Sequence, residues 1–272
     1  MKVIIKDFVP EHTFDCGQCF RWEKQSDGSF VGVANGQAVR IKADGDCVYI
    51  DGITEEDYNS FWKKYLDAER DYTDVKKSVN INETMNKSIQ FGYGIRILRQ
   101  EFFETLISFI ISQRSSIPKI KNCVNKLCEL YGEKIEFEGD IYYSFPSPEK
   151  IAALSEEDIR ALGVGYRAPY ILKAAQAVVC GEIDAELLEK ADTPAAREKL
   201  LTLYGVGDKV CDCVLLFSLG KYDLFPSDVW IKRVMDEEFD SKDAKTAGES
   251  QFGLYSGFAQ QYLFYWRKYG NV

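Results

Sequence analysis

Residues 200–233 read LLTLYGVGDKVCDCVLLFSLGKYDLFPSDVWIKR, and they contain the clearest pattern of two helices joined by a glycine turn in the chain. Its apolar pattern predicts a helix that ends at Tyr204, a tight Gly205-Val206-Gly207 turn, and a second helix that starts near Asp208. Glycines let a backbone approach a ligand closely, and the amides at a helix start attract anions. The pattern is typical of a clamp for phosphate groups, but an ordinary turn between packed helices has the same local sequence.

Lys209 falls in the first turn of the second helix, among apolar residues. Burial and the field of a helix start both favour a neutral amine, which is a nucleophile. After a second apolar stretch comes Phe225-Pro226-Ser227-Asp228, where a new helix is predicted to start. Asp228 either caps that helix or serves as a carboxylate that activates Lys209. An exposed lysine and a simple cap are the alternatives from local pattern alone.

Upstream of residue 200 the spacing of apolar residues changes once, from the alternation of strands to the spacing of helices. Short β-rich runs at 20–23, 29–34, 37–42 and 47–50 are separated by Asn-Gly and Asp-Gly turns, which predicts an antiparallel meander. From Thr54 onward the apolar spacing becomes helical. We expect helices at 54–69, 101–112, 117–131, 150–162, 166–180, 194–203, 208–219, 228–238 and 255–268.

The predicted fold class is therefore α+β, an N-terminal antiparallel β-sheet domain followed by a mostly α-helical two-part bundle. We place the sheet domain with its flanking helices at 1–80 and the helical domain at 81–272. The hairpin of two helices lies within it at about 194–219.

Composition limits the chemistry. The chain has 272 residues, no apolar run long enough to span a membrane and no leader-like N-terminus, so we expect an intracellular protein. We also expect it to be a monomer. His12 is the single histidine, which leaves carboxylates, lysine, cysteine or a bound ion for catalysis. The eight cysteines are expected to be reduced, and Cys16 and Cys19 are an isolated pair with no partner pair for a metal.

Five segments resemble, in order, segments of the 8-oxoguanine DNA glycosylase/AP lyases of the helix-hairpin-helix superfamily. These are DCGQCFRW (15–22), SFIISQRSSIPKI (108–120), LGVGYRAPYI (162–171), LYGVGDKVCDC (203–213) with its downstream FPSDV, and SGFAQQYLF (256–264). No cysteine follows Cys213, so the C-terminal iron–sulfur cluster of endonuclease III-like glycosylases is absent.

The resemblance implies excision of 8-oxoguanine from duplex DNA in base excision repair, in the cytoplasm of a prokaryote near the nucleoid. Lys209 would attack C1′, expel the base and form a Schiff base that permits β-elimination, and Asp228 would assist the amine and stabilise charge on the sugar. No cofactor is implied for catalysis. A structural monovalent or calcium cation would bind the carbonyls of Leu201, Leu203 and Val206.

The resemblance also implies a substrate pocket and a DNA face. Gly17 would offer its carbonyl to N7–H, a hydrogen that normal guanine lacks, and Gln260 would read the Watson–Crick edge. Phe264 and Cys213 would sandwich the extruded base, whose extrusion costs a few kcal/mol. The DNA contacts would come from Arg114, Ser116, Lys119, Tyr166, Arg167, Gly205 and Gly207.

Three departures from the family pattern bear on this expectation. Arg114 and Ser116 lie in a gap-filling loop that usually carries asparagines, and Trp230 replaces a histidine that contacts phosphate in relatives. Lys119 stands where eukaryotic relatives use an arginine to read the opposite cytosine, and lysine lacks that planar fork. We therefore expect a relaxed preference for the opposite base.

Two other functions remain open at this point. A monofunctional alkylated-base glycosylase has the same fold but does not need Lys209. A non-catalytic helix-hairpin-helix DNA-binding module would not need Lys209, Asp228, Gly17 and Gln260 together.

The net charge of −9 disfavours DNA as a partner only if the charge is spread evenly. Residues 91–128 carry six basic and two acidic side chains, Arg96 and Arg99 among the basic ones, which predicts a basic DNA face.

Overall fold

The structure, a computed structural model, describes residues 1–270. Its N-terminal runs form one antiparallel sheet in the order β1-β5-β4-β3-β2. The strands are β1 (Lys2–Ile4), β2 (Trp22–Lys24), β3 (Phe30–Ala34), β4 (Gln37–Asp44) and β5 (Cys47–Asp51). In the central register Phe30 lies opposite Ile41, and Ile41 lies opposite Ile50. The apolar residues of these strands therefore meet on one buried face.

Aromatic rings cover this face. Phe14, from the short helix α1 (Pro10–Phe14), stacks on Trp22 with ring centroids 3.9 Å apart. Gly32 leaves room for the indole, since a Cβ there would lie 2.4 Å from Trp22. Trp62 closes the same core from a helical segment made of α2 (Glu55–Asp57), a π-helical turn and α3 (Lys63–Tyr65).

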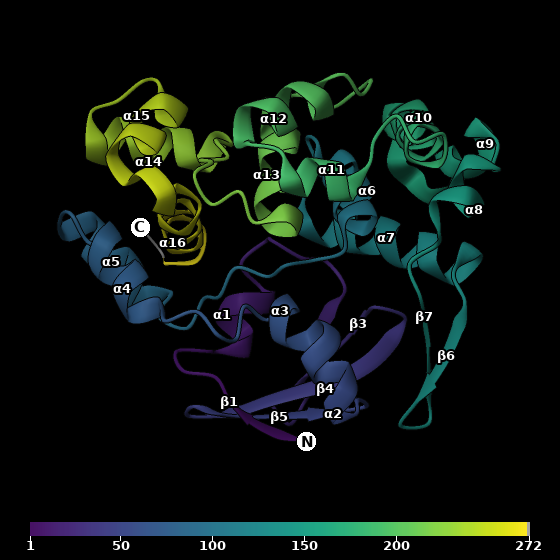
Figure 1. Ribbon diagram of the computed structural model, residues 1–272, viewed down its shortest axis with the longest axis horizontal. Helices are drawn as coiled ribbons and strands as arrows, with labels where there is room; N and C mark the ends of the chain where they lie inside the picture. Colours follow the sequence, from purple (N-terminus) through teal and green to yellow (C-terminus); the bar gives the residue numbers. More distant parts are fainter. Residues whose placement is uncertain (271–272) are drawn as a thin grey trace.

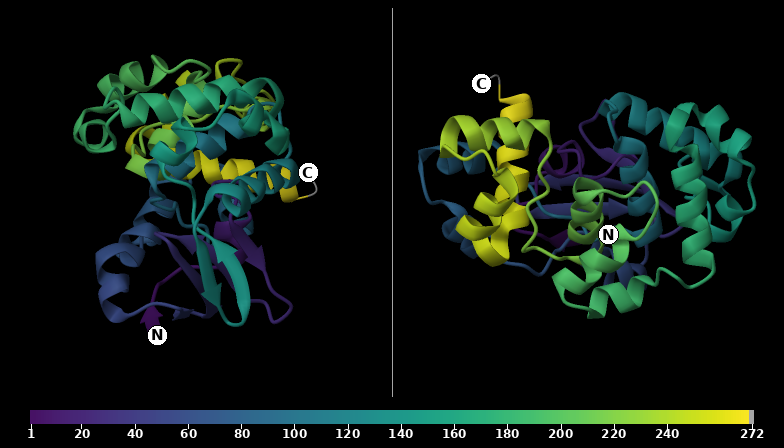
Figure 2. Two further views of the ribbon diagram at one scale, coloured as in Figure 1. Left: turned by 90° about the vertical axis from the view of Figure 1, so that its right-hand side faces the viewer. Right: turned by 90° about the horizontal axis from the view of Figure 1, so that it is seen from above.

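The remaining chain forms a helical body above the sheet (Figure 1), and it divides into two groups of helices. In one group, α16 (Ser256–Tyr269) packs against its neighbours α4 (Tyr72–Val79), α5 (Glu83–Phe91), α14 (Val229–Phe239) and α15 (Ala244–Phe252). The other group contains α6 (Phe102–Ser112), α7 (Ile117–Tyr131), α8 (Pro148–Ala152), α9 (Glu156–Ile159), α10 (Ala168–Val179), α11 (Ala185–Lys190), α12 (Thr193–Leu201) and α13 (Asp208–Leu219). The view from above separates the two groups (Figure 2).

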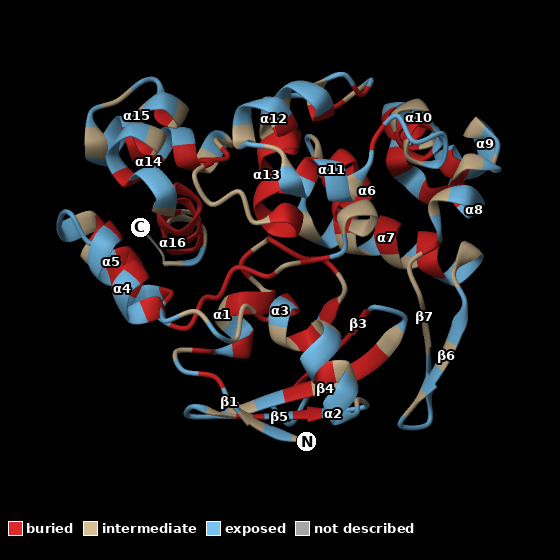
Figure 3. Ribbon diagram, viewed as in Figure 1, coloured by how far each residue is buried: buried red, intermediate tan, exposed pale blue. Residues whose placement is uncertain are grey.

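Both groups contain helices that are mostly buried (Figure 3). Every residue of α13 from Val210 to Leu219 is buried, as are the seven from Thr105 to Ile111 in α6. The α+β class and the two-part helical bundle are therefore confirmed.

One buried arginine joins the sheet to the helical body. Arg96 has no exposed surface, and its guanidinium donates to the carbonyls of Lys6 (2.6 Å), Leu66 (3.3 Å), Asp67 (2.5 Å) and Arg70 (2.8 Å). Arg99 is also mostly buried, and it pairs with Glu189 at 2.7 Å. The prediction that both arginines lie on a basic DNA face is wrong, because Arg96 is fully buried and the charge of Arg99 is paired with Glu189.

Several elements of the structure were not predicted from the sequence. Residues 134–143 form a hairpin of β6 (Lys134–Phe137) and β7 (Asp140–Tyr143), which reaches down beside the sheet, where Arg40 Nε donates to Glu138 Oε2 at 2.9 Å (Figure 2). The single helix expected at 150–162 is broken into α8, α9 and a π-helical turn. Helices α1, α4, α5, α11 and α15 were not predicted. The division at residue 80 stays a prediction, and it falls between α4 and α5, both of which pack on α16.

Candidate active site

Helix α13 begins directly after the Gly205-Val206-Gly207 turn, with Gly207 as its extended N-cap. Lys209 lies in the first turn and is half-buried. Its Nζ lies 3.5 Å from Ser112 Oγ and 4.8 Å from the centroid of the Phe109 ring. Among residues 1–270 the Lys209 amine forms no ion pair. Helix α6 therefore provides a hydroxyl and a ring face beside the amine, and no carboxylate.

Asp228 stands at the start of α14 and caps it, because its Oδ1 accepts from the amides of Trp230 and Ile231, both at 2.9 Å. Cys213 lies one turn after Lys209 on α13 and is buried. Burial raises the pKa of the Cys213 thiol to about 11; the Lys209 ammonium opposes that rise and the Asp228 carboxylate adds to it. Both charges therefore act on the Cys213 thiol, and direct contact between Lys209 and Asp228 stays a prediction.

Helix α16 supplies the other side of the site. Gln260 is 5% exposed, and its Oε1 is buried without a hydrogen-bond partner among the described residues. One turn later, Phe264 stands against Gly17, where an added Cβ would lie 3.1 Å from Phe264 Cε1. The structure therefore brings Gly17 and Phe264 together, and binding of a base by the Gln260 oxygen stays a prediction.

Buried amide side chains hold the backbone around Gly17. Gln18 Nε2 donates to the carbonyls of Thr13 and Arg96, both at 2.8 Å, and Gln18 Oε1 accepts from the Leu98 amide at 2.9 Å. Gln100 donates to the Gln18 carbonyl at 2.7 Å, and Gln261 donates to the Cys16 carbonyl at 2.7 Å. The Gly17 carbonyl itself accepts no hydrogen bond within residues 1–270.

Gln18, Gln100 and Gln261 are not among the predicted site residues. Two of them lie inside the recognised motifs, so a polar residue within an apolar motif was the available signal.

Lys268 was also missed. Its Nζ lies 5.1 Å from the Phe264 ring centroid, at i+4 on α16. Burial lowers the pKa of Lys268; Asp228 opposes this effect and Lys209 reinforces it. A second amine therefore lies near the same group of residues.

The segments expected to face DNA are hydrogen-bonded to one another. Gln113 Nε2 donates to the Gly205 carbonyl at 3.0 Å, and Arg167 donates to the Gln113 carbonyl and, at 3.0 Å, to that of Val164. Arg167 is 6% exposed, so its guanidinium serves these protein contacts. Tyr166, beside it, is 48% exposed. Direct contact of Arg167 with DNA stays a prediction.

Arg114, Ser116 and Lys119 are all exposed in the loop between α6 and α7 and in the first turn of α7. Arg114 has a φ of +50°, a conformation uncommon for a residue with a side chain. Exposure of these three side chains is compatible with the DNA contacts expected of them.

The hairpin turn requires glycine at position 205. Its φ is +86°, and a Cβ would fall 2.1 Å from the Tyr170 ring. Of the three carbonyls expected to hold a cation, that of Leu203 accepts a bond from the Val206 amide at 3.1 Å. Those of Leu201 and Val206 accept no backbone bond in the described chain. Carbonyl oxygens with free lone pairs suit hard cations, so these residues fit the expected group.

Within residues 1–270 no cluster of three or more histidine, cysteine or acidic side chains could hold a metal ion. Burial raises the pKa of the Cys16 thiol to about 12, and that of Cys19 well above its usual value, which disfavours the thiolates a metal needs. No helix in the described part of the chain is long and apolar enough to cross a membrane.

A hairpin of two helices that presents a half-buried lysine, with a capping aspartate nearby, defines the class of helix-hairpin-helix base-excision proteins. Residues 107–258 match the family model of the HhH-GPD superfamily base excision DNA repair proteins, and residues 2–106 match that of the 8-oxoguanine DNA glycosylase N-terminal domain. The chain belongs to the 8-oxoguanine DNA glycosylase family within this superfamily.

Relatives of known name are similar along most of the chain. A probable N-glycosylase/DNA lyase of Methanothermobacter thermautotrophicus is 31% identical over 73% of this chain and 70% of its own length. An N-glycosylase/DNA lyase of Arabidopsis thaliana is 30% identical over 93% of this chain and 75% of its own.

A solved structure of the Clostridium acetobutylicum 8-oxoguanine glycosylase/lyase holds duplex DNA with cytosine opposite 8-oxoguanine. It is 40% identical and superimposes with a TM-score of 0.95, covering 98% of this chain and 94% of that one.

Proposed function

We propose that this protein is a bifunctional DNA glycosylase/AP lyase that excises 8-oxoguanine from duplex DNA. The observation that carries the proposal is the environment of Lys209. Its amine lies beside Ser112 and over the Phe109 ring, in the first turn of a helix and without an ion-pair partner in residues 1–270. An amine in such surroundings is suited to act as a nucleophile.

In the proposed reaction the lone pair of Lys209 Nζ attacks C1′ of the damaged nucleotide. The bond from C1′ to N9 breaks, and its electron pair leaves with the base. Opening of the sugar gives a Schiff base between Lys209 and C1′; loss of a C2′ proton then expels the 3′ phosphate and cuts the strand. The Asp228 carboxylate stabilises the positive charge that develops on the sugar and the amine.

Recognition of the lesion falls to the main chain at Gly17 and to α16. The Gly17 carbonyl is an acceptor for N7–H of the oxidised base, and the unpaired Gln260 Oε1 is an acceptor for its Watson–Crick edge. Normal guanine has no hydrogen at N7, so it would leave the Gly17 oxygen unpaired at a cost of about 1–3 kcal/mol. Phe264 and Cys213 then enclose the extruded base.

Two further proposals concern the DNA and the hairpin. Lys119 is exposed at the start of α7 and cannot form a planar bidentate pair, which supports a relaxed preference for the opposite base. The carbonyls of Leu201, Leu203 and Val206 hold a structural monovalent or calcium cation that meets a DNA phosphate. No cofactor takes part in the chemistry.

Borohydride trapping on an 8-oxoguanine duplex tests the function. The wild-type protein should form a covalent adduct with DNA, Lys209→Gln should abolish it, and Lys87→Gln should leave it unchanged. Lys87 is a suitable control because it is an exposed lysine paired with Glu83 on α5.

Two other results would replace the proposal. Base release without an adduct would identify a monofunctional glycosylase. Binding of DNA with no base release would identify a non-catalytic binding module.

A further inference from the structure

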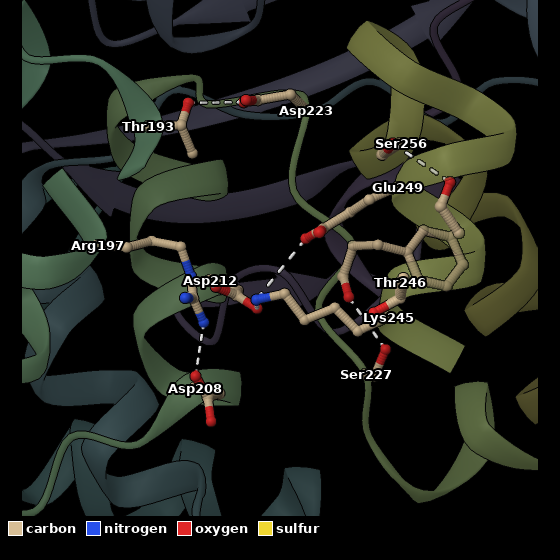
Figure 4. Close-up of polar contacts among 12 residues, drawn as sticks. Thr193, Arg197, Asp208, Asp212, Asp223, Ser227, Lys245, Thr246, Glu249 and Ser256 are labelled. Carbon is tan, nitrogen blue, oxygen red and sulfur yellow. Dashed lines mark hydrogen bonds and ion pairs between the residues drawn. The ribbon is translucent and has the colours of Figure 1, made fainter. Parts of the chain in front are cut away.

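A buried carboxylate lies inside the hairpin helix and has no part in the proposed chemistry. Asp212 precedes Cys213 and follows Lys209 by three residues on α13, and its side chain is 1% exposed. Its two oxygens have different partners. Oδ1 accepts from Arg197 Nε of α12 at 2.6 Å, and Oδ2 accepts from Lys245 Nζ of α15 at 2.5 Å. Asp212 therefore links three helices (Figure 4).

The partners of Asp212 are themselves paired with further carboxylates. Arg197 also donates to Asp208 Oδ1 at 2.6 Å, and Asp208 is 75% exposed. Lys245 lies 3.7 Å from Glu249 Oε1, which is buried and has no hydrogen bond among the described residues. Burial raises the pKa of Glu249. The cluster thus extends from the exposed start of α13 into the interior at α15.

Helix α15 in turn supports the segment that carries Asp228. Gly248 of α15 lies under Phe225, where an added Cβ would be 2.4 Å from the ring. Phe225 has no exposed surface and stacks on Phe252 at 6.0 Å with an interplanar angle of 12°. A path of side-chain contacts therefore runs from α13 through Asp212, Lys245 and α15 to Phe225, and Asp228 follows three residues later along the chain.

We infer that Asp212 is a positioning residue that fixes Asp228 relative to Lys209 through its ion pair with Lys245. The inference rests on the proposed function, because it assigns Asp212 to the same reaction. The starts of α13 and α14 carry the reacting amine and its carboxylate, and the ion pair between Asp212 and Lys245 fixes α13 against α15, the helix that packs under the segment before α14. A buried pair of this kind constrains geometry strongly, since neither charge can be released without desolvation cost.

A double-mutant cycle between positions 212 and 228 tests the inference. The measured quantity is the single-turnover rate of 8-oxoguanine release at saturating protein, at a temperature well below the melting temperature of every variant. Asp212→Asn should lower this rate by about tenfold in the wild-type background and by less than about twofold in the Asp228→Asn background. Non-additivity follows because Asp212 acts through Asp228.

The matched control is Asp208→Asn. Asp208 shares Arg197 with Asp212 but is exposed, so its removal should leave the rate within about twofold of wild type. Lys245→Met provides a second variant if Asp212→Asn fails to fold, since it breaks the link while the Asp212 bond to Arg197 remains. The same cycle with Asp228→Asn then applies.

Several outcomes would overturn the inference. Additive losses in the two backgrounds would show that Asp212 supports only the fold, and an unchanged rate in Asp212→Asn would remove any role in the reaction. A wild-type rate in Asp228→Asn would exclude both the role of Asp228 and this inference. Absence of 8-oxoguanine release by the wild-type protein would instead refute the proposed function.

Discussion

The backbone of Gly17 touches the ring of Phe264, so closely that a methyl group on Gly17 would stand 3.1 Å from Cε1. The φ of Gly17 is +81°, which favours glycine independently of any neighbour. Any other residue at position 17 would therefore suffer both backbone strain and crowding by the Phe264 ring.

Gly17→Ala should lower the rate of 8-oxoguanine release by about tenfold, because the methyl group pushes the Phe264 ring out of its position beside Gly17. Gly28→Ala is the control, since Gly28 has the same φ of +81° but no atom within 4 Å of an added Cβ. Both substitutions should reduce the free energy of unfolding by about 1–3 kcal/mol through strain. Thermal unfolding and single-turnover release separate the two effects. Equal release rates for the two variants would refute a role for the contact with Phe264.

Gln260→Leu removes a buried acceptor oxygen that has no hydrogen-bond partner among the described residues, so the melting temperature of this variant should equal or exceed that of the wild-type protein. The same change should lower the rate of 8-oxoguanine release by about 10- to 100-fold, because a hydrogen bond to the base is lost. Gln261→Leu is the contrasting variant. It removes the bond to the Cys16 carbonyl and should lower the free energy of unfolding by about 1–3 kcal/mol. A destabilised Gln260→Leu protein would show that Gln260 supports the fold.

Lys119 predicts the response to the base opposite the lesion. Rates of release opposite cytosine, adenine, guanine and thymine should agree within about threefold for the wild-type protein. Lys119→Arg should raise the preference for cytosine by about 5- to 100-fold, the range that a bidentate contact contributes. Lys126→Arg, an exposed lysine on the same helix, should change nothing. Strong cytosine preference in the wild-type protein would contradict the proposal.

Glu104 predicts how stability depends on pH. Burial raises the pKa of Glu104 to about 7, and Arg21, at 3.1 Å, opposes this rise. Because the pKa of Glu104 is higher in the folded protein than in the unfolded chain, protonated Glu104 favours the folded state. This contribution to the free energy of unfolding is complete below the pKa of the unfolded chain, and it is lost as the pH rises through about 7. The loss amounts to about 3 kcal/mol at most. Glu104→Gln should flatten the free energy of unfolding, measured by urea denaturation, between about pH 5 and pH 8. An unchanged slope would exclude Glu104 as its source.

Local pattern predicted much of this fold. Strands β2 to β5 lie close to their predicted positions because Asn-Gly and Asp-Gly turns separate them, and α6 and α7 have clear apolar periods. Helices α12 and α13 lie close to their predicted positions because the Gly205-Val206-Gly207 turn separates them. The β6–β7 hairpin was missed, and neither of its strands has a buried residue that would set an apolar alternation. Arg40 on β4 anchors it through Glu138, a contact across 98 residues.

The positions of the charged side chains were the hardest feature of the structure to predict from the sequence. Arg96 looked like a DNA-facing cation, but it is fully buried and bound to four main-chain carbonyls. Every residue has a main-chain carbonyl, so the sequence does not indicate which carbonyls bind an arginine. The burial of Arg96 could therefore not be predicted from neighbouring residues. Asp212 was overlooked for a similar reason, since its partners lie 15 and 33 residues away.

The acceptor proposed to recognise the lesion is a main-chain oxygen held by the amides of Gln18, Gln100 and Gln261. Every amino acid at position 17 would still supply that oxygen, so no substitution there can delete it. The contact with N7–H can therefore be altered only through the position of the backbone, which these side chains hold. Attempts to redirect this enzyme toward other oxidised purines should begin with those three glutamines.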